Sequence, residues 1–331
     1  MVSAQDLELK LQDLYKKKKY SDIISQITLK TKEEDRNAGL FVLLGISRMS
    51  IGLKDKNQVS LAVQDFKRGY LKEQKGVNGL NALANFVVAS SILSDFENTN
   101  VDFEEIKHFY HISPKPFSDQ RPINIAMSTM YSRLSDYKGM VFHLEKIIKS
   151  KEFIVQDLCN YGYWRCFDKN WTQSDFLEFG KFVNDNLREY SNKDIVPLSD
   201  KKNEKVRVGF LSADLKGAHS ITYFLKTVLQ NYDKKFFEII LFNNRNKDDK
   251  PPDELINLAT KSIDVGKLND IEAFNTIRKF NLDIMIDIMG YTSRNKIEFF
   301  KNRLAKKQAI WMGYCNTCLL YTSDAADDCR C

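Results

Sequence analysis

Apolar residues recur every three or four positions through the first half of the chain, which is the period of an amphipathic helix. In residues 5–18, for example, Leu7, Leu11 and Leu14 fall on one helical face. The same pattern predicts further helices over 20–29, 38–53, 59–70, 123–134 and 137–150. Residues 113–122 hold three of the six prolines and are predicted to be a connecting loop. We therefore expect a stack of helices over about residues 1–190.

One predicted helix pair has the spacing of a known repeat. Phe41, Leu44 and Gly45 in its first helix are followed by Ala62 and Phe66 in its second. This pattern resembles a tetratricopeptide repeat, in which small residues let two helices approach closely and aromatic rings fill the remaining space. The predicted turn between the helices is longer than the repeat normally has. Such a stack is either a scaffold or a surface that recruits protein partners, and the sequence leaves both open.

The pattern changes after residues 191–205, a polar segment without periodicity that we take as the domain boundary. Strands are then expected at 206–212, 236–243, 262–266, 282–288 and 308–312. Helices are expected between them, at 221–231, 251–260, 271–280 and 294–303. This regular alternation predicts a parallel, doubly wound α/β sheet, so the whole chain has an α plus α/β organisation.

Composition narrows the function classes. The chain has 331 residues, 43% of them hydrophobic and 28% charged, which is typical of a globular protein. The net charge of +6 comes with short lysine clusters, at 16–19 and 201–205, that lack interleaved aromatic residues. We therefore expect no nucleic-acid partner. The longest weakly polar run, 80–93, is too short to span a bilayer, and charged residues interrupt any N-terminal signal. We expect a cytoplasmic protein without a membrane partner.

Four of the six cysteines lie near the end of the chain, at 315, 318, 329 and 331. Clustered cysteines are typical of zinc or disulfide sites. Their spacing does not match a zinc ribbon, and no histidine lies nearby. We expect no metal site.

Two predicted loops carry the candidate chemistry, because ligands bind at the carboxyl ends of parallel strands. The first contains Asp214 and His219, followed by Ser220, after the first strand. A helix begins there, and its N-terminus suits a phosphate or a developing negative charge. The residue types also allow a structural interpretation, in which Asp214 only caps the following turn.

The second loop follows the fourth strand and contains Asp287, Gly290, Tyr291 and Thr292. Gly290 would permit a sharp turn or a close backbone approach, and the two hydroxyl groups would contact a ligand. An ordinary turn, with Thr292 or Ser293 as the N-cap of the next helix, explains the same residues equally well.

Two runs of sequence carry a resemblance to a known family. They are VRVGFLSADLKGAHSITYFL at 206–225 and LDIMIDIMGYTSRNKIEFFKNRLAKKQAIWMGYCNT at 282–317. Their ordered motifs are S-x-D…H-S, D-x-x-G-Y-T and Q-x-x-W-x-G-Y. These blocks resemble the N-terminal catalytic lobe of glycosyltransferase family 41, the protein O-linked N-acetylglucosamine transferases, including SPINDLY-like and bacterial types. The family also carries tetratricopeptide repeats ahead of its GT-B catalytic region.

The resemblance implies a hexosyltransferase that uses a UDP-sugar donor, typically UDP-GlcNAc, and protein acceptors, without a cofactor. It implies transfer to Ser or Thr with inversion at the anomeric carbon and without a metal. Asp214 would then accept the acceptor's proton, directly or through water, and His219 would position donor or acceptor. Ser220, Asp287, Gly290, Tyr291 and Thr292 would line the substrate site.

The chain departs from the family pattern in three places. The segment from Asp214 to His219 is one residue longer, and no second histidine lies between Trp171 and Lys205. The sequence shows no counterpart of the family's second Rossmann-like lobe. Residues 318–331 resemble the translation of a sequencing-adapter DNA rather than natural protein sequence. We therefore expect four segments: repeats at 1–190, a linker at 191–205, the lobe at 206–317 and a non-native tail at 318–331. A one-lobe fragment is expected to be inactive, because one lobe cannot stabilise a transition state held between two.

Two alternatives stay open. One is a protein N-glucosyltransferase or another sugar specificity within the same family. The other is a non-catalytic helical-repeat adaptor with a degenerate lobe.

Overall fold

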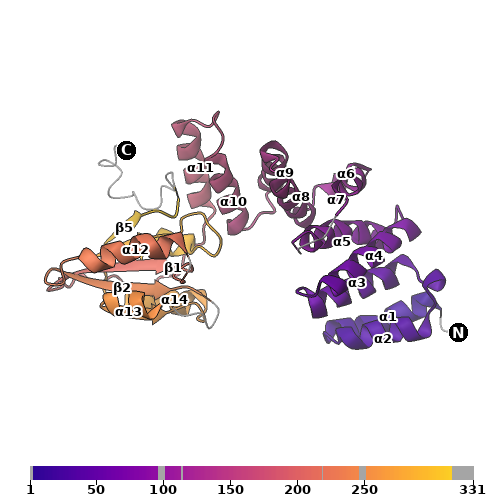
Figure 1. Cartoon of the computed structure of the whole chain (residues 1–331), viewed down its shortest axis with the longest axis horizontal. Helices are drawn as coiled ribbons and strands as arrows, with labels where there is room; N and C mark the ends of the chain where they lie inside the picture. Colours follow the sequence, from indigo (N-terminus) through magenta and orange to yellow (C-terminus); the bar gives the residue numbers. More distant parts are fainter. Residues whose placement is uncertain (1–2, 96–100, 113–114, 218, 246–250, 315–331) are drawn as a thin grey trace. The chain divides into compact units, whose positions relative to one another are not determined.

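The computed structural model describes residues 3–95, 101–112, 115–217, 219–245 and 251–314. The chain divides into two compact units, Met1–Phe153 and Ile154–Cys331. Figure 1 shows helices alone in the described part of unit 1, and helices around a sheet in unit 2. Each unit is considered by itself below. The four cysteines near the end of the chain, and the segment predicted as a non-native tail, lie outside the described residues.

Unit 1 is a stack of antiparallel helices joined by short turns. Its elements are α1 (Ala4–Lys16), α2 (Tyr20–Lys30), η1 (Glu33–Asp35), α3 (Ala38–Gly52), α4 (Lys56–Lys72), α5 (Val77–Leu93), α6 (Phe103–Ile112), α7 (Lys115–Ser118), α8 (Arg121–Arg133) and α9 (Tyr137–Ser150). The six helices predicted from periodicity are confirmed as α1 to α4, α8 and α9. Periodicity did not predict α5 or α6. The segment predicted as a proline-rich loop contains the short helix α7, so that prediction was wrong over these residues.

The pair α3 and α4 packs as the repeat resemblance suggested. A Cβ added at Gly45 would lie 2.5 Å from the Phe66 ring, so the absence of a side chain there lets the ring sit against α3. Phe41, Ala62 and Phe66 are buried in the same pair of helices. The turn between α3 and α4 spans only residues 53–55, because α4 begins at Lys56, directly after its N-cap Asp55 and earlier than periodicity predicted. The turn is therefore shorter than expected.

Two titratable side chains are buried inside unit 1. Asp65 on α4 accepts a hydrogen bond from Arg48 on α3, at 2.7 Å. His143 on α9 is 2% exposed; its Nδ1 lies 2.8 Å from Oδ1 of Asn124, and its ring stacks on that of Tyr131. Burial raises the pKa of Asp65 to about 6, against the lowering effect of Arg48. Burial lowers the pKa of His143 to about 3. Both groups therefore favour their neutral forms in the folded protein more than in water.

Unit 2 contains the predicted parallel sheet. Its strands are β1 (Val206–Ser212), β2 (Phe237–Asn243), β3 (Lys261–Asp264), β4 (Ile284–Asp287) and β5 (Lys307–Ile310). Its helices are α10 (Val155–Arg165), α11 (Gln173–Asp185), α12 (Ser220–Asn231), α13 (Asp253–Leu258), α14 (Asp270–Arg278) and α15 (Ile297–Lys301). The strand order is β3-β2-β1-β4-β5, with every pair parallel. All five predicted strands are confirmed. Helix α15 is shorter than predicted.

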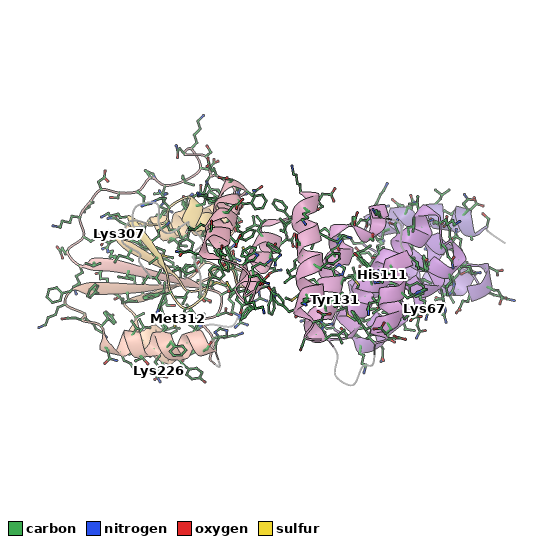
Figure 2. All side chains as sticks on the ribbon, turned by 90° about the horizontal axis from the view of Figure 1, so that it is seen from above. Lys67, His111, Tyr131, Lys226, Lys307 and Met312 are labelled. Carbon is green, nitrogen blue, oxygen red and sulfur yellow. The ribbon has the colours of Figure 1, made fainter. Side chains whose placement is uncertain are left out.

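The sheet is covered on both faces, because alternate residues of a strand point to opposite sides. Ile239 and Leu241 of β2 pack with Leu225 of α12 and Leu255 of α13. Lys226, on the solvent side of α12, pairs with Glu254 of α13 at 2.5 Å (Figure 2). On the other face, the ring of Phe242 meets that of Phe280, just after α14, at 5.4 Å. This is the doubly wound arrangement that the alternation of strands and helices predicted.

Helices α10 and α11 belong to the same compact unit as the sheet. The expected division placed them with the repeats, ending at residue 190. Backbone groups that follow α11 bind the lobe: the Tyr190 N–H donates to Oδ1 of Asn302 at 2.6 Å, and the Arg188 N–H donates to Glu298. Residues 191–205 lack helix and strand, yet the Val196 N–H donates a hydrogen bond to Oδ1 of Asn275 at 2.7 Å. The segment expected as a linker is thus bound along the lobe.

Within the described residues, every helix is too short or too polar to cross a bilayer.

Candidate functional site

The two predicted loops lie side by side at one edge of the sheet. We call residues 213–219 the β1 loop and residues 288–296 the β4 loop. Strands β1 and β4 are neighbours, with Leu211 paired to Asp287. The chain runs outward from β1 through β2 to β3, whereas β4 and β5 lie on the opposite side. The boundary between β1 and β4 is therefore the topological switch point, where a doubly wound sheet opens a crevice for ligands.

The β1 loop is held by its own backbone and by the start of α12. The Asp214 N–H donates to Oγ of Ser212 at 2.9 Å, and the hydroxyl of Thr222 donates to the carbonyl of Lys216 at 2.7 Å. The Ala213 N–H contacts Sδ of Met289 at 3.0 Å, which joins this loop to the β4 loop. These contacts fix the backbone on both sides of Asp214, whose side chain remains 25% exposed.

His219 is the N-cap of α12. Its Nδ1 accepts a hydrogen bond from the Ile221 N–H at 3.4 Å, so the neutral ring carries its proton on Nε2. That Nε2 lies 3.8 Å from Oδ1 of Asp214, which is a close approach but longer than a hydrogen bond. A ligand oxygen near both groups would find a donor on His219 and an acceptor on Asp214. Ser220, the first residue of α12, is exposed beside them.

The β4 loop is built around a buried carboxylate. Asp287 is 1% exposed, and it accepts hydrogen bonds from the N–H groups of Met289 at 2.8 Å and Gly290 at 3.1 Å. Gly290 has a φ of +55°, which favours glycine, and an added Cβ there would overlap Cβ of Tyr314. The hydroxyl of Thr292 donates to the carbonyl of Met289 at 2.8 Å. The sharp turn expected at Gly290 is therefore present, and polar groups of the loop hold it.

Tyr291 lies inside the protein. It is 1% exposed, and its ring centroid is 4.4 Å from that of Tyr314. A Cβ added at Gly162 of α10 would lie 2.6 Å from Cε2 of Tyr291, so this ring packs directly on the helix. The helix after the loop begins at Ile297 with Lys296 at its N-cap, so the interpretation of Thr292 or Ser293 as its cap was wrong.

The seven predicted site residues thus fall into two groups. Asp214, His219 and Ser220 have side chains open to solvent at the switch point. Asp287, Gly290, Tyr291 and Thr292 shape the adjacent turn, and the first three are buried. Direct substrate contact by this second group stays a prediction. Sequence reasoning missed α10, whose only signal was a glycine between two tyrosines, Tyr161-Gly162-Tyr163.

A hollow of about 680 Å³ lies away from these loops. It is lined by residues of the segment 196–205 with Arg207, Glu238 and residues of 278–281, where β1 and β2 begin. Its arginines are engaged: Arg207 pairs with Glu238 at 2.8 Å, and Arg278 donates to three backbone carbonyls. In the described part of the chain, no group of three or more His, Cys, Asp or Glu side chains is arranged to hold a metal ion.

Comparisons with known proteins point to one family. Residues 188–324 match the family model described as Glycosyl transferase family 41. A protein of Solanum lycopersicum named "Probable UDP-N-acetylglucosamine--peptide N-acetylglucosaminyltransferase SPINDLY" is 27% identical over 121 residues, which cover 35% of this chain and 13% of that protein. A protein of the same name from Oryza sativa subsp. japonica is 24% identical over 151 residues, which cover 44% and 16%. The chain thus spans about a sixth or less of these relatives.

A solved structure extends the likeness to most of the chain. A mutant of the O-GlcNAc transferase of Thermobaculum terrenum matches with a TM-score of 0.58 at 14% identity. The match covers 87% of this chain and 52% of that one. At this level of identity the match concerns the fold, and it includes helical repeats as well as the α/β lobe.

Proposed function

Because residues 188–324 are a glycosyltransferase family 41 region, we propose that this chain is part of a protein glycosyltransferase whose reaction centre includes the β1 loop. The proposed reaction moves N-acetylglucosamine from UDP-GlcNAc to a Ser or Thr hydroxyl of a protein, with inversion and without a metal. The observation that carries this proposal is the pairing of Asp214 with His219 at the switch point, with Oδ1 and Nε2 3.8 Å apart.

Glycosyl transfer with inversion is a single displacement. The acceptor oxygen bonds to the anomeric carbon while the bond from that carbon to the UDP oxygen breaks on the opposite face. The acceptor's proton must leave as its oxygen bonds, and a carboxylate beside it lowers the barrier. Asp214 takes this proton, directly or through one water. The Nε2–H of His219 donates to a donor or acceptor oxygen, and the cap at Nδ1 keeps that proton in place.

The helical stack of unit 1 is proposed to recruit protein acceptors. Its support is the repeat-like packing of α3 and α4, since helical repeats commonly form extended binding surfaces. We also propose that residues 1–331 do not transfer sugar by themselves. The described residues hold one Rossmann-like sheet, and a donor bound between two lobes needs both.

A radiolabelled transfer assay tests this function. The product of the complete reading frame is compared with residues 1–331, using UDP-GlcNAc or UDP-glucose and a mixture of protein acceptors. We expect transfer by the former, resistance to EDTA, and a β-linked product by NMR. Asp214→Asn and His219→Phe should each lower kcat by about 100-fold or more. Asp253→Asn, the same change at an exposed position of α13, serves as the control. Absence of transfer from any donor would favour the adaptor alternative, and transfer from UDP-glucose alone would favour the other sugar specificity.

A further inference from the structure

We propose that helix α10, which precedes the family-matched residues 188–324, is a positioning element of the candidate site. In this proposal, Gly162 of α10 holds the β4 loop in place through Tyr291 and Tyr314. The role deepens the proposed function, on which its catalytic consequence rests. The physical coupling of α10 to the loop is a separate claim that can be measured without any enzymatic activity.

The first support is close packing at Gly162. An added Cβ would lie 2.6 Å from Cε2 of Tyr291 on one side and 2.6 Å from Cε1 of Phe179 of α11 on the other. Real Cβ atoms do not approach other atoms so closely, so α10 fits between α11 and the loop only with glycine at this position. Because packed interiors transmit strain, a methyl group there must displace both rings or shift α10 itself.

The second support is polar. The hydroxyl of Tyr314 donates to the carbonyl of Gly162 at 3.3 Å. Sγ of Cys159, one turn earlier on α10, lies 3.8 Å from Oδ1 of Asn295 at the far end of the β4 loop. Burial raises the pKa of the Cys159 thiol to about 12, so it remains a neutral donor. Helix α10 therefore contacts the loop at Tyr291 and Asn295, and it also binds Tyr314, which the loop packs against.

The third support is the route from these contacts to the reacting groups. Tyr291 directly follows Gly290, whose N–H is bound by Asp287, and Met289 touches the backbone of the β1 loop at Ala213. A displaced Tyr291 ring would therefore strain the turn at Gly290. The distance between this turn and Asp214 would change as a result. Enzymes tolerate such shifts poorly, because a change of about 1 Å in a reacting geometry lowers rates by about 100-fold.

Hydrogen exchange on the folded chain tests the coupling. We expect Gly162→Ala to lower the protection of amides in peptides covering 288–296 by about tenfold or more, while those of β1 and β2 change little. Gly45→Ala is the matched control: it places the same methyl group 2.5 Å from an aromatic ring, but in unit 1. It should leave exchange in the β4 loop unchanged.

A milder pair of variants covers the case in which Gly162→Ala does not fold. Tyr314→Phe removes only the hydroxyl that binds the Gly162 carbonyl, and it should still raise exchange in 288–296 by about two- to fivefold. Its matched control is Tyr232→Phe, which removes a hydroxyl that binds the Leu258 carbonyl at 3.4 Å elsewhere in unit 2. Unchanged exchange in 288–296 for both Gly162→Ala and Tyr314→Phe, or a uniform increase across unit 2, would overturn the coupling.

The catalytic consequence is measured separately, on the product of the complete reading frame with UDP-GlcNAc. We expect Gly162→Ala to lower kcat about tenfold or more with the donor KM within about twofold, and Tyr232→Phe to leave both unchanged. A wild-type kcat in Gly162→Ala, despite faster exchange in the loop, would refute the positioning role. If the wild-type protein transfers no sugar, the proposed function fails while the exchange result still decides the coupling.

Discussion

Replacement of Asp287 separates a structural role from a binding role. Its carboxylate accepts N–H groups of Met289 at 2.8 Å and Gly290 at 3.1 Å from a position that is 1% exposed. Hydrogen bonds to a charged group contribute about 1.5–3 kcal/mol each. Asp287→Ala removes both acceptors, and it should lower the free energy of unfolding of unit 2 by about 3–6 kcal/mol. Asp287→Asn keeps one acceptor but turns an NH₂ group toward the other N–H, so a loss of about 2–3 kcal/mol is expected.

Tryptophan fluorescence during urea unfolding measures this loss selectively. The three tryptophans, at 164, 171 and 311, all belong to unit 2, so the signal reports on that unit alone. The midpoint should fall without a change in slope, since the surface exposed on unfolding stays the same. Asp253→Asn, the same chemical change at an exposed position, provides the control and should stay within about 0.5 kcal/mol of wild type.

The opposite pattern would refute the reasoning. If Asp287→Ala unfolds at the wild-type urea concentration but binds substrate more weakly, the carboxylate does not hold the turn. Direct substrate contact, as the sequence suggested for Asp287, would then be the better account.

Three further predictions follow from groups described above. Folding raises the pKa of Asp65 to about 6, so its contribution to the stability of unit 1 is present below about pH 4 and is lost as pH rises to about 6. The free energy of unfolding should fall by about 3 kcal/mol over this range, as urea titrations followed by circular dichroism would measure, and Asp65→Asn should remove this pH dependence. Folding lowers the pKa of His143 to about 3, so stability is lost as pH falls from about 6.5; His143→Phe should abolish that acid-side loss, and an unchanged pH dependence would contradict the burial argument. Gly290→Ala adds left-handed strain and an overlap with Tyr314, and it should lower the melting temperature of unit 2 by several degrees, whereas a wild-type value would show that the turn adjusts without cost.

The sequence was most informative where one local signal decided the structure. The mostly apolar run from Val206 to Ser212, which follows the polar segment 191–205, predicted β1 with its observed bounds. Parallel topology then required the loops after β1 and β4 to share an edge, so the position of the candidate site followed from the order of elements. His219 and Ser220 were correctly expected at a helix start, because a cap is a local feature.

Features that depend on distant contacts were not predictable in this way. The burial of Asp287 was not predicted: the positive φ at Gly290 folds the backbone amides of the loop back onto its carboxylate, and direct contact with substrate stays a prediction. Helices α10 and α11 were assigned to the repeats, because nothing in the pattern around Gly162 specifies a partner more than 100 residues later. Periodicity missed α5 because buried residues occur nearly all around it, including Leu80, Ala82 and Leu83. A helix buried on most sides has no amphipathic stripe to detect.

The central place of β1 in the sheet has a consequence for synthesis on the ribosome. Unit 1 is built mainly from contacts between helices that are close together in the sequence, so it can fold while the rest of the chain is still being translated. Strand β1 can pair with β2 soon after both leave the ribosome. Its other edge pairs with β4, so Phe210 remains unpaired on that side until Ile286 has been synthesised. The contacts of helix α10 form later still, because Tyr314 is synthesised about 150 residues after Gly162. Before β4 has been synthesised, the unpaired edge of β1 and the apolar face of α10 are exposed at the same time. Nascent chains of this protein should need chaperones most during this interval.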